Sequence, residues 1–309
     1  MDTDILIQQI INGLVQGSLY ALLALGYTMV YGVINLINFA HGEVLMVGAL
    51  TSWTVVGLLQ QTGWPGWLLL LISLIAAVVV CSALNFLIEK FAYKPLRNAP
   101  RLAPLITAMG VSLLLQTLAV IFWKPSPKPF PILLPQELFY IGGAVINTVQ
   151  IIILVVTVLT LAGLMLLVNT TRLGRAMRAT AENPRSAALM GVNPDHVISA
   201  TFIIGAALAA LAGVMYAANF GIVQHTMGFL PGLKAFTAAV FGGIGNLPGA
   251  MLGGVLLGLI ENLAAGYSAK LTGGLIGSDY KDVFAFIVLI LILTLRPQGL
   301  LGERVADRA

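Results

Sequence analysis

The sequence predicts an all-α integral membrane protein. Of its 309 residues, 59% are hydrophobic and 9% are charged, and the mean hydropathy is +0.96. Soluble domains average about 45–50% apolar and 25% charged residues. Long uncharged runs alternate with polar stretches that are too short to fold independently. We therefore expect one transmembrane domain over residues 1–309.

The apolar runs are the predicted membrane helices. A membrane-spanning helix needs roughly 20 residues, or fewer where it is broken or packed within protein. Trp64, Trp67 and Trp123 border these runs, where aromatic side chains suit the membrane interface. Eight such runs are visible: 5–33, 44–59, 67–88, 102–123, 149–168, 197–220, 235–265 and 283–295.

Basic residues predict the orientation of the chain. Eleven of the sixteen Lys and Arg side chains lie in residues 89–103, 169–196 and 296–309. Positive charge accumulates in cytoplasmic loops of membrane proteins, so these three segments should be cytoplasmic. The net charge of +4 is then explained by topology rather than by nucleic acid. Residues 124–150 begin with a proline-rich string and should form an external excursion, with room for a small strand pair.

Counting crossings predicts a break near the C-terminus. An even number of crossings must separate the cytoplasmic loop at Arg185 from the tail at Arg296, yet only three apolar runs lie between them. The run 235–265 contains GGIGNLPG at Gly242–Gly249, and glycine and proline interrupt helices. We expect this run to be double or re-entrant, which gives about eight to ten passages in all.

A second break is expected near the N-terminus, within YGVINLINFAHGEVLMVG. Its four polar residues lie between apolar runs, where an ionisable group costs at least about 2.5–3.5 kcal/mol and usually faces a bundle interior or a water-filled cavity. A broken helix exposes backbone groups that a polar solute could contact. Single residues could instead bridge neighbouring helices. Two breaks, one in each half, also suggest an internal repeat. The polar residues are Asn35, Asn38, His41 and Glu43.

The region of the second break offers further candidates for a translocation path. Unwound backbone at its glycines could meet a zwitterion, although tight helix packing explains glycines equally well. Glu261 could line the path or form a hydrogen bond between helices. The candidates here are Gly242, Gly243, Gly245, Asn246 and Glu261.

Enzymatic and metal sites are not expected in this chain. His41 and Glu43 are separated by one residue, whereas a helical metal site such as H-E-x-x-H places its two histidines at i and i+4. No phosphate-binding loop is present, so any ATP must be hydrolysed by another protein. Cys81 is the only cysteine, which excludes an intrachain disulfide. The N-terminal MDTD has no basic region typical of a removable signal peptide.

The segment 169–196 predicts a docking element. Asn183 precedes Pro184, and Gly191 follows seven residues after Pro184, a start and stop pattern for a short helix. Small apolar residues would let that helix enter a groove, and nearby arginines could orient it against acidic rims. The alternative is an ordinary basic loop that only enforces topology. The candidate coupling residues are Arg175, Arg178, Glu182, Pro184, Ala187, Ala188 and Gly191.

One string connects these features to a known family. YGVINLINFAHGE resembles the signature of permease subunits of ATP-binding-cassette importers for branched-chain and other hydrophobic amino acids. The resemblance continues through Leu19-Tyr20-Ala21, FGGIGNLPGAMLGG, Tyr280-Lys281-Asp282 and RPQGLLG. It implies a multi-pass protein of the bacterial inner membrane. It also implies a second homologous permease subunit, two cytoplasmic ATPases that bind ATP and magnesium, and an external solute-binding protein, with no cofactor in this chain.

The resemblance also implies that the short helix is a coupling helix that engages the ATPases. The common importer motif has Glu-Ala-Ala followed three residues later by Gly. Aligning Gly191 with that glycine puts Arg185-Ser186-Ala187 in place of Glu-Ala-Ala, so the contacts should differ. Urea, short amides or sugars remain alternative solutes. A proton-coupled secondary transporter, with Glu43 and Glu261 carrying protons, is the alternative from another class.

Overall fold

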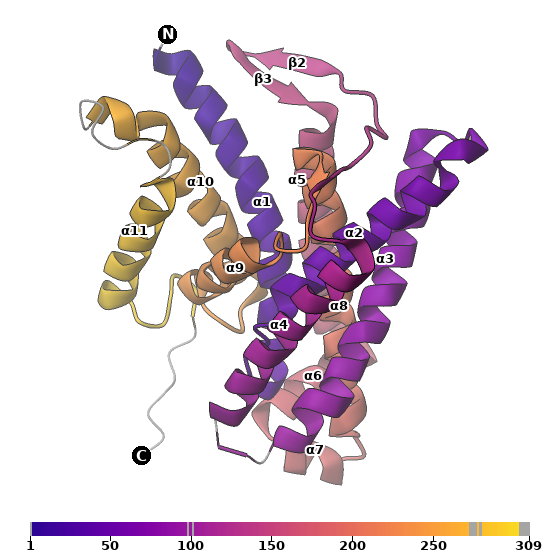
Figure 1. The fold of residues 1–309 in the computed structure, drawn as a ribbon. Coiled ribbons are helices and arrows are strands. Elements are labelled where there is room, and N and C mark those ends of the chain that lie inside the picture. The colour runs from indigo at the N-terminus through magenta and orange to yellow at the C-terminus, as the bar shows by residue number, and fades with distance from the viewer. Residues whose placement is uncertain (1, 98, 101, 272–276, 278–279, 303–309) are drawn as a thin grey trace.

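The protein is a bundle of helices (Figure 1). The computed structural model describes residues 2–97, 99–100, 102–271, 277 and 280–302. Within this part of the chain, seven helices are long and apolar enough to cross a membrane, which confirms an all-α membrane protein. They are α1 (Asp2–Ile34), α2 (His41–Leu59), α3 (Gly66–Ile88), α4 (Leu102–Trp123), α5 (Thr148–Thr170), α8 (Pro194–Phe220) and α10 (Leu247–Leu271).

Two shorter helices complete the predicted set of passages. The apolar run 235–265 is divided between α9 (Phe229–Gly242) and α10, as its central glycines predict. The run 283–295 lies in α11 (Lys281–Leu295), which has 15 residues. With the seven long helices, α9 and α11 agree with the expectation of about eight to ten passages.

The remaining elements of the described residues are two pairs of short strands and five short helices. The hairpin of β2 (Leu138–Ile141) and β3 (Ala144–Asn147) follows the proline-rich stretch and matches the expected strand pair. A second pair, β1 (Lys128–Pro129) with β4 (Ile222–Val223), was not predicted, because strands of two residues leave no pattern in the sequence. Other short helices are η1 (Gln60–Thr62), η2 (Glu89–Tyr93), η3 (Lys94–Leu96), α6 (Arg172–Glu182) and α7 (Pro184–Leu189).

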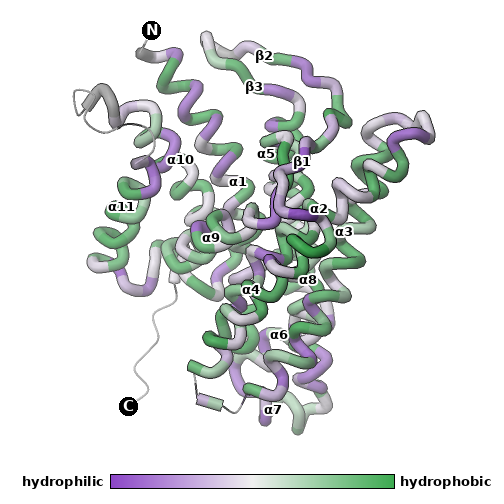
Figure 2. Tube along the Cα trace, viewed as in Figure 1, coloured by the Kyte–Doolittle hydropathy of each residue, from purple (hydrophilic) through white to green (hydrophobic). Residues whose placement is uncertain are grey.

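Helix α1 lies at the centre of the bundle and is less apolar than α3, α4 and α5. The most apolar window of α1 is 83% buried, against 22% for α3, 22% for α4 and 17% for α5. Mean hydropathy runs the other way, at 1.5 in α1 and 3.1 in α5. This order is expected in lipid, because an outward face must be apolar whereas an inward face can carry small and polar residues that pack closely. Figure 2 shows the strongly hydrophobic outer helices.

Glycines let α1 and α10 approach closely. Gly13 and Gly17 on α1 face Gly254 and Gly258 on α10, and each pair has the G-x-x-x-G spacing. A Cβ placed on Gly17 would lie 2.7 Å from the Cα of Val255, closer than side-chain carbons come to backbone. Backbone therefore packs directly on backbone, as small residues permit in membranes.

Both predicted breaks are present. The first falls between α1 and α2, where Asn35 has a φ of 52°, a conformation that asparagine tolerates better than most residues. The second falls between α9 and α10, where Gly243 and Gly245 have φ values of 110° and 95°. Gly242 packs directly against the backbone of Gly249. The internal repeat stays a prediction.

Candidate translocation site

The first break is held by a buried polar network. Asn38 lies in the loop between α1 and α2, and its Oδ1 accepts hydrogen bonds from the Tyr93 hydroxyl at 3.0 Å and from the backbone N–H of Ala40 at 3.1 Å. Its Nδ2 donates to Oδ1 of Asn85 on α3 at 3.4 Å, and Asn85 donates to the carbonyl of Phe202 on α8 at 2.7 Å. Asn38 thus joins the break to α3 and α8, whereas Asn35 is exposed.

His41 and Glu43 follow in the first turn of α2. His41 is fully buried, with its ring 4.8 Å from that of Tyr27 and its Nε2 directly against Gly26 on α1. Glu43 is 1% exposed. Its Oε1 accepts hydrogen bonds from Nε2 of Gln116 at 2.7 Å and from the Ser112 hydroxyl at 3.2 Å, both on α4. Its other oxygen, Oε2, has no hydrogen-bond partner among the described residues.

A cavity of about 800 Å³ adjoins Glu43. Its walls come from α1, α2, α4, α9 and the end of α8 together with the segment that follows it. Most of the lining is apolar, and the polar side chains include Glu43, Ser112, Gln116 and Gln224. Of the nine residues predicted for the path, Glu43 lines this cavity and the other eight do not.

Glu261 lies apart from the cavity, in an ionic cluster that connects four helices. Its Oε1 is 2.7 Å from Nζ of Lys234 on α9 and 3.4 Å from Nζ of Lys281 on α11. Its Oε2 accepts a hydrogen bond from the Tyr20 hydroxyl on α1 at 2.9 Å. Lys234 also pairs with Asp282 on α11 at 2.8 Å. In this structure Glu261 makes the interhelical hydrogen bonds that were the alternative to a path-lining position.

The second break contacts the C-terminal segment. The backbone N–H groups of Leu300 and Leu301 donate to the carbonyls of Phe241 and Gly242 at 2.9 and 3.0 Å. Nδ2 of Asn246 donates to the carbonyl of Leu301 at 2.9 Å, and Gly243 packs against Gly302. Gly245 is exposed. The break is therefore covered by residues that follow α11. The rest of the predicted tail, from residue 303 onward, lies outside the described residues.

The predicted docking helix is present as α7. The side chain of Asn183 accepts from the backbone N–H groups of Arg185 and Ser186 at 3.0 and 3.1 Å, which caps the helix. Gly191 has a φ of 85° and follows the helix end, as expected for a glycine at that position. Leu189 and Met190 are 88% and 87% exposed at the tip.

The other predicted coupling residues differ in exposure. Ala188, Pro184 and Glu182 are exposed, whereas Ala187 is buried. Arg175 donates to the carbonyl of Thr170 at 3.1 Å, and Arg178 donates to the carbonyl of Val168. These two arginines therefore bind the free carbonyls at the end of α5.

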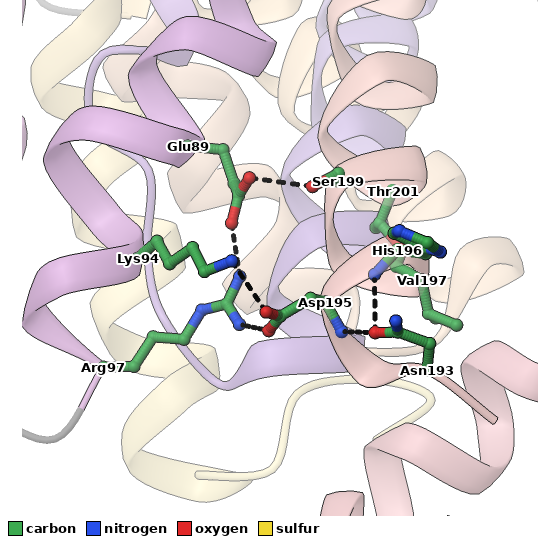
Figure 3. A network of polar contacts seen from close by, with 9 residues as sticks. All are labelled: Glu89, Lys94, Arg97, Asn193, Asp195, His196, Val197, Ser199 and Thr201. Atoms are coloured by element: carbon green, nitrogen blue, oxygen red, sulfur yellow. Dashed lines mark hydrogen bonds and ion pairs between the residues drawn. The ribbon is translucent and has the colours of Figure 1, made fainter. Parts of the chain in front are cut away.

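A second ionic network fixes the base of α3 to the base of α8 (Figure 3). Glu89, which is buried, accepts from Arg97 and from the Ser199 hydroxyl, the latter at 2.8 Å. Asp195 forms ion pairs with both Arg97 and Lys94, and its Oδ2 lies 2.7 Å from the Lys94 Nζ. The sequence predicts only a topological role for Lys94 and Arg97, and in the structure both also form ion pairs between helices.

Three polar residues of these sites were not predicted from the sequence. Ser112 and Gln116 lie in an apolar run, and nothing in a single sequence connects them to Glu43. Lys234 could have been identified from the sequence. A lysine within a membrane helix is energetically costly, and it therefore implies a nearby acidic or polar partner. Lys234 lies one residue before the predicted apolar run 235–265.

Comparison with known proteins places the chain in a family. Residues 9–293 match the family described as the permease component of branched-chain amino acid transport systems. The chain is 47% identical over 302 residues to the high-affinity branched-chain amino acid transport system permease protein BraD of Pseudomonas aeruginosa, covering 96% of both chains. It is 44% and 43% identical to the corresponding LivH proteins of Escherichia coli K12 and Salmonella typhimurium, again with 96% of both chains covered. No solved structure matches.

These matches extend over nearly the whole chain and include both breaks, the ionic clusters and α7. They agree with the family resemblance of the string YGVINLINFAHGE, which contains the first break. The chain belongs to the family of permease components of branched-chain amino acid transport systems.

Proposed function

We propose that the chain is the transmembrane subunit of an ATP-driven importer of branched-chain or other hydrophobic amino acids in the bacterial inner membrane. The names of the relatives support this class of solute. A second permease subunit and two ATPases, which bind ATP and magnesium, would complete the membrane assembly. An external solute-binding protein would deliver the amino acid, and this chain would hold no cofactor.

The exposed tip of α7 is the observation that carries this proposal. A capped helix presents Leu189 and Met190 almost fully to the outside, at the end of the bundle opposite the β2–β3 hairpin (Figure 1). Large apolar side chains on a protruding helix favour insertion into a partner's groove. We assign this end, with the loop 169–196 and the tail 296–309, to the cytoplasm, where the ATPases would bind.

The substitution Ala188→Arg tests the docking assignment. Ala188 is exposed next to Leu189, so a large charged side chain should abolish co-purification of the ATPase subunits while membrane insertion stays normal. The matched control is Gln61→Arg in η1, which is exposed at the other end of the bundle. ATPase recovery that is equal for both variants would refute the docking assignment.

Reconstitution tests the transport mechanism. Vesicles that contain both permease subunits and the ATPases, with the solute-binding protein on the outer side, should accumulate leucine only when ATP is present at the ATPases. Uptake by the permease alone, driven by a proton gradient, would instead establish a secondary transporter.

A further inference from the structure

Glu43 lines the cavity, and one of its two carboxylate oxygens is buried without a hydrogen-bond donor among the described residues. Glu43 is 1% exposed, and Oε1 takes both the available donors, Gln116 and Ser112, while Oε2 takes none. A buried charge is costly unless it is paired. A cation bound at Oε2 would remove that cost, and the cavity provides the space for a molecule that carries one.

The first turn of α9 forms another part of the same cavity. Phe229–Gly232 line it, and no side chain caps the helix, whose N-cap residue is Gly228. In this turn the N–H of Phe229 donates to the carbonyl of Thr226 at 3.3 Å, the N–H of Gly232 donates to the carbonyl of Gly228 at 2.9 Å, and Pro231 has no N–H. The N–H of Leu230 therefore remains for a ligand, together with about half a positive charge at the helix N-terminus. It is therefore suited to bind an anion such as a carboxylate.

Two helix N-termini meet at this point. Gly42, in the first turn of α2, packs directly against the carbonyl of Gly228, and a Cβ on Gly42 would lie 2.9 Å from the Cα of Gly232. Two like partial charges in close contact are unfavourable in a medium of low dielectric constant. The Glu43 carboxylate offsets part of this repulsion, and the carboxylate of a bound ligand would offset more.

The rest of the cavity suits an apolar side chain. Tyr27, Phe39, Met109, Leu113 and Phe220 contribute to its walls. The volume of about 800 Å³ lies within the roughly 300–1,000 Å³ of small-molecule sites. A carboxylate with one unpartnered oxygen, a helix N-terminus without a side-chain cap and an apolar wall are thus combined in one site of suitable size.

We propose that this cavity binds an apolar amino acid as a zwitterion. Glu43 Oε2 takes the α-ammonium group, the first turn of α9 takes the α-carboxylate, and the apolar walls take the side chain. This inference rests on the proposed function, since it assigns the solute of that importer to one site. A primary ammonium group could also come from the headgroup of an amine lipid, and the experiment separates the two sources.

The test measures binding of radiolabelled L-leucine to the assembled complex in vesicles of phosphatidylcholine and phosphatidylglycerol, which have no primary amine. Glu43→Gln keeps the shape and the acceptor for Gln116 but removes the charge. Because a charge-assisted hydrogen bond is lost, affinity should fall about tenfold or more. Glu137→Gln, the same change at an exposed position before β2, should bind leucine as the unmodified protein does.

A second pair of variants tests the helix N-terminus without altering Glu43. Leu230 is exposed, lines the cavity and lies in the first turn of α9. Leu230→Glu places an anion where the ligand carboxylate should bind, and a negative charge there favours the helix. It should weaken leucine binding about tenfold more than Leu230→Gln, which changes size equally without the charge. Competition by 4-methylpentanoate, which lacks the amine, and by 3-methylbutylamine, which lacks the carboxylate, should each be at least about tenfold weaker than by leucine.

Four results would overturn the site. They are absence of saturable leucine binding, unchanged binding by Glu43→Gln, equal binding by the two Leu230 variants, and displacement of leucine by added phosphatidylethanolamine. ATP-dependent uptake in the same vesicles separates the two proposals. Normal ATP-driven uptake with binding unaffected by these variants rejects only the site, whereas variant-sensitive binding without ATP-driven uptake rejects only the importer function.

Discussion

Replacing Lys234 with methionine should destabilise the protein by about 3–5 kcal/mol, because it leaves a buried carboxylate without its main partner. Lys234 Nζ is 2.7 Å from Glu261 Oε1, and Glu261 is 1% exposed. Lys281 is farther from that oxygen, at 3.4 Å, and is itself half exposed, so it cannot replace Lys234. Thermal unfolding of the detergent-purified protein would measure the loss.

The double variant Lys234→Met with Glu261→Met distinguishes an unpaired charge from lost packing. Removing both charges should restore most of the stability, since buried ion pairs contribute little net free energy relative to apolar residues of similar size. Lys281→Met serves as the control and should cost at most about 1 kcal/mol, because the side chain is about half exposed and lies farther from Glu261 than Lys234 does. A double variant no more stable than Lys234→Met alone would contradict the electrostatic explanation.

Most of the fold could be predicted because lipid imposes a simple rule on the sequence. Spans must be long and apolar, so the eight apolar runs correspond to helices, and the glycines at Gly242–Gly249 marked the division of one run in two. Residues that begin or end a helix act on the adjacent backbone. Asn183 and Gly191 therefore predicted the two ends of α7, which the structure confirms. These signals depend only on neighbours in the chain.

The candidate site was less predictable because its parts come from distant segments. Glu43 was identified as an intramembrane acid, but its partners Ser112 and Gln116 lie about 70 residues away on α4. The glycines of the second break looked suited to a path, yet Gly243 packs against Gly302 of the C-terminal segment. Glycine is common both in unwound backbone and where two helices pack closely. A glycine in the sequence therefore does not show which of these two structures is present. Whether the solute passes either break stays a prediction.

The packing of α10 directly on the backbone of α1 predicts the other large effect. Gly258 on α10 lies directly against the backbone of Gly17 on α1, so any added carbon must displace main chain rather than a flexible side chain. Overpacking of a well-packed interior costs about 1–3 kcal/mol and more where nothing can move. Gly258→Leu should therefore abolish recovery of a monodisperse protein in size-exclusion chromatography.

Gly163→Leu on α5 is the matched control, because a Cβ at Gly163 meets nothing within 4 Å. Both substitutions replace a glycine within a membrane helix by the same residue, and leucine favours the helix at either position. Any difference between them must arise from the contact of α1 with α10. If Gly258→Leu were recovered as well as Gly163→Leu, the two helices could not be packed backbone to backbone, and the central position of α1 would have to be abandoned.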